Sequence, residues 1–401
     1  MSKRSNALVA LGVTLAIQAF TSLAATAASV LASEIGRDAG LNPALIGVFV
    51  GTLYVGAMFA SLASGGFIER YGAIRISQTC TVVCAIGLAL VAGPTWALII
   101  APLVIGVGYG PITPASSHLL SRTASPRTMA LTFSIKQTGV PLGAALAGAM
   151  LPVITLHYGW RAAIGATAFA GVLIAIAAQP SRAALDVGMI REHRVSLERL
   201  FSPLRVVARS SALVELTGIG FVYAATQVSL LSFLVVYMNH EVGQTLVSAG
   251  LALAVATLGG VVGRVSWGVI ADRWIAPRRM LGVLGVVAGT CAILVASFDA
   301  AWPTPVRMLI CALFGMTAIG WNGVQLSEVA RQSPRGQAGA VTGASGFITF
   351  SGVVVGPPLF SLLASLTGSY AAGFAAIGAI CLGSGVWLLR RSRVRTPARG
   401  S

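Results

Sequence analysis

Long apolar runs are the feature that most constrains what this 401-residue chain can fold into. Runs of about 18 residues or more recur from end to end, and each can cross a hydrocarbon core of roughly 30 Å as a helix. Because the runs are uninterrupted, they lack the alternation that is typical of membrane barrels. Only 9% of the residues are charged, against about 25% in an ordinary soluble domain. The pattern predicts an all-α membrane protein.

The runs predict twelve membrane-spanning helices. The first run follows basic residues as a signal peptide would, but its length and the eleven runs after it favour a retained span. An even number of spans places both termini on one side of the membrane. The predicted spans are residues 8–33, 45–66, 76–93, 96–120, 129–154, 161–178, 212–239, 245–270, 280–298, 303–330, 337–366 and 370–390.

The basic residues predict the orientation of these spans. Of 27 lysines and arginines, Lys136 and Arg264 lie well inside spans, 22 fall on one side of the membrane, and only Arg37, Arg161 and Arg307 fall on the other. Basic residues collect on the cytoplasmic side, so we expect a bacterial inner-membrane protein with both termini in the cytoplasm. The net charge of +16 then reflects topology and attraction to anionic lipid headgroups, and no nucleic-acid partner is expected.

The two halves of the chain repeat each other. Residues 65–70 (GGFIER) follow the second span and residues 268–273 (GVIADR) follow the eighth. Between the two sets of six spans lies the longest polar stretch, so we expect bundles at residues 1–180 and 212–401, the latter with a short basic tail, joined by a cytoplasmic linker at 181–211. Two parallel six-helix halves are one plan of membrane transporters, with the solute site near the midplane between them.

These motifs resemble signatures of the major facilitator superfamily. Residues 65–75 (GGFIERYGAIR) resemble its pattern G-x-x-x-D-R-x-G-R-R/K between spans 2 and 3, and residues 268–279 resemble the weaker copy between spans 8 and 9. Residues 159–161 (GWR) are similar to the short signature that begins the sixth span. The resemblance implies that family's fold and transport by alternating access. The departures are Glu69 for aspartate, Ala73 and Ile74 for basic residues, and Ile275 for glycine.

The same motifs imply a conformational clasp. A small glycine lets two helices approach closely, and an acid–arginine pair would hold the helix ends together in the outward-facing state. The alternative is a static surface ion pair worth under about 1 kcal/mol; recurrence in both halves favours the clasp. Its predicted residues are Gly65, Glu69, Arg70, Arg75, Gly268, Asp272, Arg273, Glu328 and Arg331.

Lys136 and Arg264 are the two charges placed well inside the spans. Each lies roughly two helical turns from the cytoplasmic end of its helix, and a charge at such depth marks a functional site by default. All eleven acidic residues lie in loops or near span ends. We therefore expect the two cations to face a common cavity and bind an anion. The alternatives are that Lys136 snorkels to the surface and that Arg264 braces the nearby loop.

Each cation has a distinct predicted role. Arg264 is placed like the carboxylate-binding arginine of monocarboxylate transporters and oxalate/formate antiporters, and a guanidinium holds a carboxylate through two parallel hydrogen bonds. Lys136 would bind a second anionic group, or set the charge balance and release the anion more easily. Polar side chains expected to line the same cavity are Gln18, Gln227, Tyr109, Thr113, Tyr223, Asn322 and Gln325, although each taken alone is typical of interhelical hydrogen bonding.

The leading hypothesis is a secondary transporter of a small organic anion, a mono- or dicarboxylate, acting as symporter, antiporter or uniporter. The rival is a proton-coupled exporter of hydrophobic drugs, which predicts a cavity acid that the sequence lacks. A membrane enzyme or receptor is disfavoured, since no nucleotide loop, metal-ligand spacing or extra soluble domain is found. We expect a monomer with no cofactor and no metal, a co-transported proton being one form of coupling.

Overall fold

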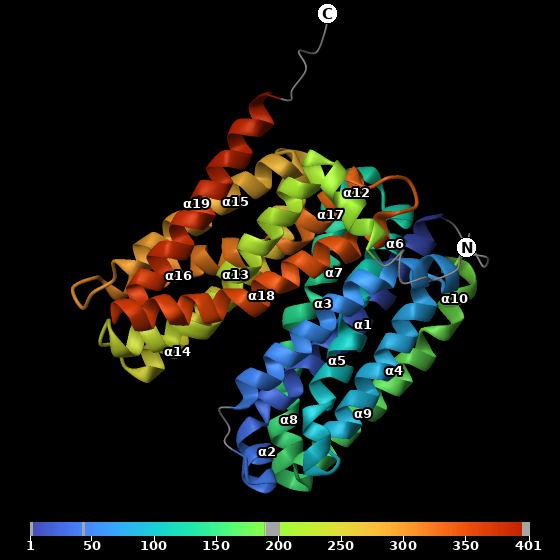
Figure 1. The fold of residues 1–401 in the computed structure, drawn as a ribbon, viewed down its shortest axis with the longest axis horizontal. Coiled ribbons are helices and arrows are strands. Elements are labelled where there is room, and N and C mark those ends of the chain that lie inside the picture. The colour runs from blue at the N-terminus through green and yellow to red at the C-terminus, as the bar shows by residue number, and fades with distance from the viewer. Residues whose placement is uncertain (1–2, 42–44, 188, 190–200, 395–401) are drawn as a thin grey trace, which may run out of the picture. The chain divides into compact units, whose positions relative to one another are not determined.

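A computed structural model describes residues 3–41, 45–187, 189 and 201–394 (Figure 1). The middle of the predicted linker (190–200) and the predicted basic tail (395–401) lie outside the described residues. In the described ranges every regular element is a helix. Twelve helical segments there are long and apolar enough to span a membrane, which confirms the predicted fold class.

The helices follow the predicted order of spans. The first half contains α1 (Lys3–Val30), α2 (Ala32–Ala39), α3 (Ile46–Tyr71), α4 (Ala73–Val91), η2 (Thr95–Ile99), α5 (Ala101–Tyr109), α6 (Ile112–Thr123), η3 (Pro126–Thr128), α7 (Met129–Gln137), α8 (Gly139–Tyr158), α9 (Trp160–Ala177) and α10 (Gln179–Leu185). The second contains α12 (Ser202–Arg209), α13 (Ser211–His240), α14 (Leu246–Arg273), α15 (Pro277–Ala296), α16 (Thr304–Ala318), α17 (Asn322–Gln332), α18 (Ala338–Thr367) and α19 (Tyr370–Val394).

Three spans are interrupted near their middles. One breaks between α5 and α6, where Pro111 has no N–H to donate into the preceding turn. Another breaks at Thr138, between α7 and α8, and a third at residues 319–321, between α16 and α17. Discontinuous helices are the usual frame of solute sites in transporters, because a broken span exposes backbone and side-chain groups inside the membrane.

The chain forms two compact units, each described here by itself. Unit 1 comprises Met1–Pro126, Ile135–Val214 and Val329–Phe350, and unit 2 comprises Arg127–Ser134, Glu215–Glu328 and Ser351–Ser401. Unit 1 therefore includes the first part of α18, and unit 2 includes the first part of α7. Each unit is built from segments of both halves of the sequence.

In unit 1, α1 packs on α8, α3 on α5, and α4 on both α5 and α9. Figure 1 shows α4 and α9 running side by side. Their contacts form a core of aliphatic and aromatic side chains that includes Phe20, Leu53, Leu88, Ile105 and Ile164. This core holds the elements that carry the first candidate site.

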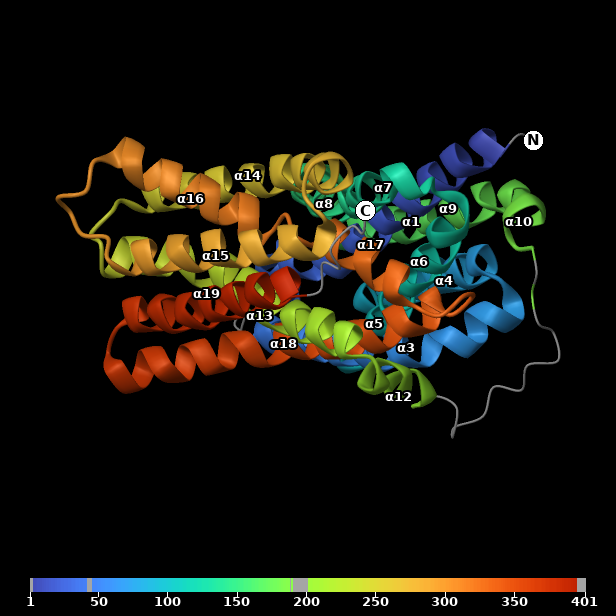
Figure 2. The same ribbon diagram turned by 90° about the horizontal axis from the view of Figure 1, so that it is seen from above.

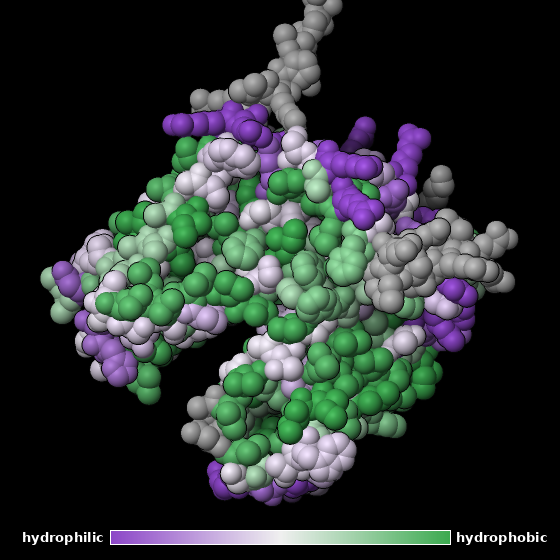
Figure 3. Space-filling model, in the orientation of Figure 1, coloured by the Kyte–Doolittle hydropathy of each residue, from purple (hydrophilic) through white to green (hydrophobic). Residues whose placement is uncertain are grey.

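In unit 2, α15 packs on α19 and α16, and α14 packs on α16 (Figure 2). The Tyr237 hydroxyl of α13 donates to the Val295 carbonyl of α15 at 2.8 Å. The rings of Phe233 and Phe360 stack with centroids 4.4 Å apart, which joins α13 to α18. Along the flanks of the helices the surface is mostly hydrophobic, and hydrophilic side chains gather near the helix ends (Figure 3), as lipid contact requires.

Candidate functional site

The Lys136 ammonium lies at the centre of a buried polar cluster in unit 1. Lys136 is 1% exposed, and its Nζ lies 2.6 Å from Oε1 of Gln18, 3.2 Å from Oε1 of Gln137 and 3.4 Å from Oγ1 of Thr113. The ammonium has three donors and no acceptor, so three side-chain oxygens suit it. The cluster brings together α1, α6 and the last turn of α7, and the ammonium does not extend to the surface.

The oxygens of this cluster are neutral amide and hydroxyl groups. The helices that contribute them, α1, α6 and α7, contain no acidic residue. None of these three oxygens carries a charge, so a carboxylate that reached the ammonium would add an attraction between opposite charges. Chemically, the arrangement is suited to binding a carboxylate.

The helix breaks explain how the cluster is assembled. Gln137 follows Lys136 directly, and neighbouring helical residues normally point in different directions. α7 ends at Gln137, which lets both side chains reach one point. Sequence reasoning selected Gln18, Thr113 and Lys136 but missed Gln137, because only the break at Thr138 makes it a neighbour of the ammonium.

Arg264 lies in unit 2, on α14. It is 2% exposed and is among the largest fully buried side chains in the described residues. Next to it in sequence, Gly263 faces the backbone of α16, and the indole Nε1 of Trp267 donates to the Met316 carbonyl at 2.7 Å. Arg264 is therefore carried by a helix fixed against α16. Its convergence with Lys136 remains an expectation.

A second polar cluster in unit 2 is built on Gln227. Its Oε1 accepts hydrogen bonds from Nε1 of Trp321 at 3.1 Å and from Nδ2 of Asn322 at 3.2 Å. Trp321 and Asn322 lie where α17 begins after the break. Gln18 of the first span and Gln227 of the seventh span thus each contact residues close to the break of an interrupted span. Trp321 was not selected from the sequence, since an aromatic residue inside a span carries no signal of its own.

The remaining predicted cavity residues have separate partners. The Tyr223 hydroxyl donates to the Leu281 carbonyl at 2.7 Å, and its ring lies edge-on to Trp321 with centroids 5.7 Å apart. Nε2 of Gln325 donates to the Leu216 carbonyl at 3.3 Å. These two residues take the interhelical hydrogen-bonding role that was the alternative for each of them. Tyr109 is half-buried on α5, among aromatic rings.

Within unit 1, the first clasp motif joins α3 to the start of α18. A Cβ on Gly65 would lie 2.6 Å from the Cβ of Ala340, so only glycine permits this approach. One turn earlier, the Ser61 hydroxyl donates to the Gly343 carbonyl at 3.2 Å. Arg331 donates to the Pro126 carbonyl at 3.2 Å. The close helix approach expected from the motif is therefore present at this position.

Within unit 2, the second clasp motif joins α14 to the start of α7. The Asp272 carboxylate accepts hydrogen bonds from the backbone N–H groups of Ala130 and Leu131 at 3.0 and 2.7 Å. A carboxylate at a helix N-terminus also interacts favourably with the helix dipole. Gly268 lies against Ser134, whose Oγ would be 2.7 Å from an added Cβ. Asp272 thus caps the N-terminus of α7, a role that the sequence motif does not predict.

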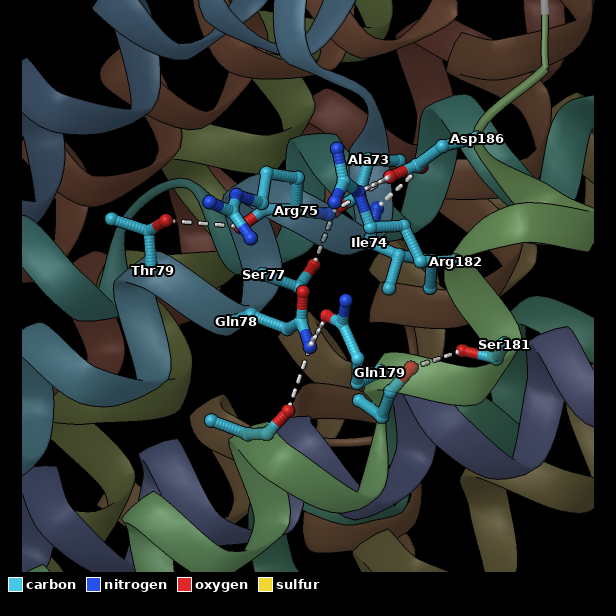
Figure 4. A network of polar contacts seen from close by, with 12 residues as sticks. Ala73, Ile74, Arg75, Ser77, Gln78, Thr79, Gln179, Ser181, Arg182 and Asp186 are labelled. Carbon is cyan, nitrogen blue, oxygen red and sulfur yellow. Dashed lines mark hydrogen bonds and ion pairs between the residues drawn. The ribbon is translucent and has the colours of Figure 1, made fainter.

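Asp186, which follows α10, caps the N-terminus of α4 within the first signature (residues 65–75) in unit 1. Its carboxylate accepts from the backbone N–H groups of Ile74 and Arg75 at 2.8 and 3.0 Å (Figure 4). Gly72 has φ +92, and an added Cβ there would collide with Asp186. Burial raises the pKa of Asp186, while the bonds from Ile74 and Arg75 and the charge of Arg182 oppose that rise. The contact joins residues 112 positions apart, so no local pattern predicts it.

A buried ion-pair cluster in unit 2 was also missed. The Glu215 side chain, 3% exposed, contacts Arg278 and lies 2.7 Å from Nη1 of Arg391. The sequence alone indicates only that Glu215 is an acid near the end of a span. The five cysteines are buried and free. No cluster of three or more metal-binding side chains occurs in the part of the chain that the structure describes.

Twelve spans, interrupted helices and buried polar clusters on those interruptions define a polytopic membrane transporter. The profile of the Major Facilitator Superfamily matches residues 14–357. The chain therefore belongs to the Major Facilitator Superfamily.

Several known proteins are similar to this chain over most of its length. The hexuronate transporter of Bacillus subtilis (strain 168) is 21% identical over 385 residues, covering 91% of this chain and 90% of that protein. The gentisate transporter of Corynebacterium glutamicum is 24% identical and covers 82% and 75%. Monocarboxylate transporter 13 of Bos taurus is 28% identical and covers 81% and 72%.

A solved structure shares the fold. The human organic anion transporter TETRAN superposes with a TM-score of 0.74 at 17% identity, covering 97% of this chain and 100% of that one. At this identity the likeness concerns the fold alone. It agrees with the family assignment from the sequence profile.

Proposed function

We propose that this protein is a secondary transporter that moves a small organic anion, a mono- or dicarboxylate, across a bacterial inner membrane by alternating access. The observation that carries the proposal is the Lys136 ammonium, 1% exposed and held by the oxygens of Gln18, Thr113 and Gln137. A charge inside a membrane span is costly. Its retention at a helix break is best explained by an anionic ligand.

Lysine suits a site that must both bind and release its ligand. A carboxylate that approaches Lys136 would replace one of the neutral oxygens with a charged acceptor, which adds a direct attraction between opposite charges. The ammonium is a compact charge with rotatable donors, so it can return to Gln18 when the anion leaves. The glutamine thus serves as a partner of the ammonium between binding events.

Arg264 is proposed to bind the same substrate from the second half of the chain. Its guanidinium would hold a carboxylate through two parallel hydrogen bonds. This role requires the bundles 1–180 and 212–401, joined by the linker 181–211, to meet at a common site, as the plan of two repeated halves implies. The polar residues Gln227 and Asn322 would then form hydrogen bonds with polar substituents of the substrate.

The names of related proteins support an organic anion over a hydrophobic drug. The hexuronate, gentisate and monocarboxylate transporters are named for carboxylates. The drug-exporter hypothesis predicts an acid in the first span or nearby, and α1 has none. We therefore favour the carboxylate transporter and retain the exporter as an outcome of the test.

Alternation is proposed to act through the clasp residues. The contact of Gly65 with Ala340 and the cap from Asp272 to α7 each join segments of opposite sequence halves. An inward-facing state would separate such segments, with both termini and both signatures on the cytoplasmic side. The proposed working unit is a monomer. The driving force for transport would depend on the charge of the substrate, with or without a co-transported proton.

Uptake by proteoliposomes tests this proposal. Radiolabelled mono- and dicarboxylates and a cationic drug are offered to wild type, Lys136→Ala, Arg264→Ala and Lys3→Ala, the last altering the chain's other lysine. The proposal expects carboxylate uptake by wild type and Lys3→Ala and at least a tenfold loss in the other two. Drug transport without carboxylate transport, or full uptake by Lys136→Ala, would refute it.

A further inference from the structure

Three aromatic side chains form a cluster in unit 1 that the proposed anion site does not use. The Tyr109 ring on α5 lies 6.3 Å from the Tyr54 ring on α3, and both lie near Phe350 of α18, at 6.1 and 5.9 Å. All three side chains are half-buried, unlike Lys136. Each of the three residues keeps part of its surface exposed, which leaves room for contact with a ligand.

One member of this cluster, Tyr109, precedes a residue that contacts the ammonium by about one helical turn. Tyr109 and Thr113 are four residues apart, with Gly110 and Pro111 both in right-handed helical conformation, so the two side chains share a face. Four residues correspond to a rise of about 6 Å. Thr113 in turn lies 3.4 Å from the Lys136 ammonium. The aromatic surface and the anion contact are therefore linked through Tyr109 of α5 and Thr113 of α6, which lie on one interrupted span.

We infer that the substrate is a hydroxylated aromatic carboxylate, whose carboxylate binds Lys136 and whose ring packs against Tyr54, Tyr109 and Phe350. This inference rests on the proposed function and names its substrate class. Aromatic rings attract one another at centroid separations of 4.5–7 Å in offset or edge-on geometry, and the edge-on Tyr54–Tyr109 pair, with an interplanar angle of 89°, offers both a face and an edge. The tyrosine hydroxyls can exchange hydrogen bonds with ring hydroxyls.

Size and polarity separate this class from other carboxylates. A short aliphatic acid would gain the Lys136 contact and leave the three rings uncovered. A sugar acid has a ring but lacks a flat π face, so it would form weaker contacts with the aromatic side chains. The cluster is therefore a specificity determinant, whereas Lys136 accepts any carboxylate.

The chain offers a matched control for the test. Phe347 also lies on α18 and pairs with Phe59 of α3, at 5.5 Å. Phe350→Leu and Phe347→Leu thus remove the same ring from the same helix facing the same partner helix. Only the former alters the cluster next to Tyr109.

The experiment measures uptake of labelled hydroxybenzoate, hexuronate and lactate by wild type, Tyr109→Ala, Phe350→Leu and Phe347→Leu. Wild type should prefer hydroxybenzoate. Tyr109→Ala and Phe350→Leu should raise its KM roughly 3- to 10-fold and should raise the KM for lactate less, and Phe347→Leu should match wild type. Melting temperatures in detergent close to that of wild type show that the variants are folded.

The outcomes separate the two proposals. If Lys136→Ala abolishes carboxylate uptake but wild type prefers lactate or hexuronate, or if Phe350→Leu and Phe347→Leu behave alike, the aromatic inference is wrong and the anion transporter stands. If wild type transports none of the three carboxylates, the proposed function fails, and the inference fails with it.

Discussion

The side-chain oxygen of Gln18 lies 2.6 Å from the ammonium of Lys136, which joins the first span to the interrupted fifth span. Both residues are about 1% exposed. The pair gives the buried cation an uncharged partner. A charged partner at the same position would be expected to compete with an anionic substrate.

Gln18→Glu tests this competition. The substitution keeps the shape of the side chain and places a carboxylate beside Lys136, so the ion pair should form and the substrate should be excluded. We expect uptake to fall at least tenfold while the melting temperature stays at or above that of wild type. Gln244→Glu, in the turn before α14, is the control and should transport normally. Normal uptake by Gln18→Glu would refute the competition.

Gly65→Ala tests the close approach of α3 and α18. An added Cβ would lie 2.6 Å from that of Ala340, so the helices must shift, and overpacking typically costs about 1–3 kcal/mol. We expect a lower melting temperature in detergent and slower transport. Gly148→Ala on α8 meets nothing within 4 Å and should be neutral. Equal melting temperatures for the two variants would show that the approach is not tight.

Glu215→Gln tests the buried ion-pair cluster. Glu215 is 3% exposed and Arg278 is 15% exposed, so the substitution removes a charged partner from a largely buried guanidinium. Such a loss destabilises by on the order of 3 kcal/mol. Glu34→Gln breaks the exposed pair with Arg37 and should cost under about 1 kcal/mol. Chemical denaturation in detergent compares the two, and the account fails here if the surface variant is the less stable one.

The pH dependence of stability tests the burial of Asp186. Because burial raises the pKa of this carboxyl, the folded chain holds the proton to a higher pH than the unfolded chain does. The protonated Asp186 carboxyl then makes its full contribution to stability below the pKa that it has in the unfolded chain. That contribution is lost as pH rises through the pKa that it has in the folded chain. Relative to Asp186→Asn, wild type should therefore lose melting temperature from acidic to neutral pH. The opposite trend would mean that the capping bonds from Ile74 and Arg75 outweigh burial.

Much of the fold could be predicted from the sequence because lipid imposes simple rules. The length of the apolar runs gave twelve spans, and the motifs after the second and eighth spans gave the family. The sequence also selected Gln18, Thr113 and Lys136, since buried polar groups in a membrane span stand out.

The contacts that depend on breaks and on distant segments could not be predicted. Gln137 reaches the ammonium only because α7 ends there. Asp186 reaches Ile74 across 112 positions, and Asp272 caps α7 through backbone N–H groups that leave no mark in the sequence. Periodicity and hydropathy describe single helices, whereas these contacts depend on how the helices pack.

The most direct measurement of the central claim is the dissociation constant of a transported carboxylate for purified wild type, Lys136→Ala and Lys3→Ala. If the buried ammonium binds the anionic group, Lys136→Ala should bind at least tenfold more weakly, a loss of about 1.4 kcal/mol or more, and Lys3→Ala should match wild type. Binding by Lys136→Ala within twofold of wild type would contradict the account.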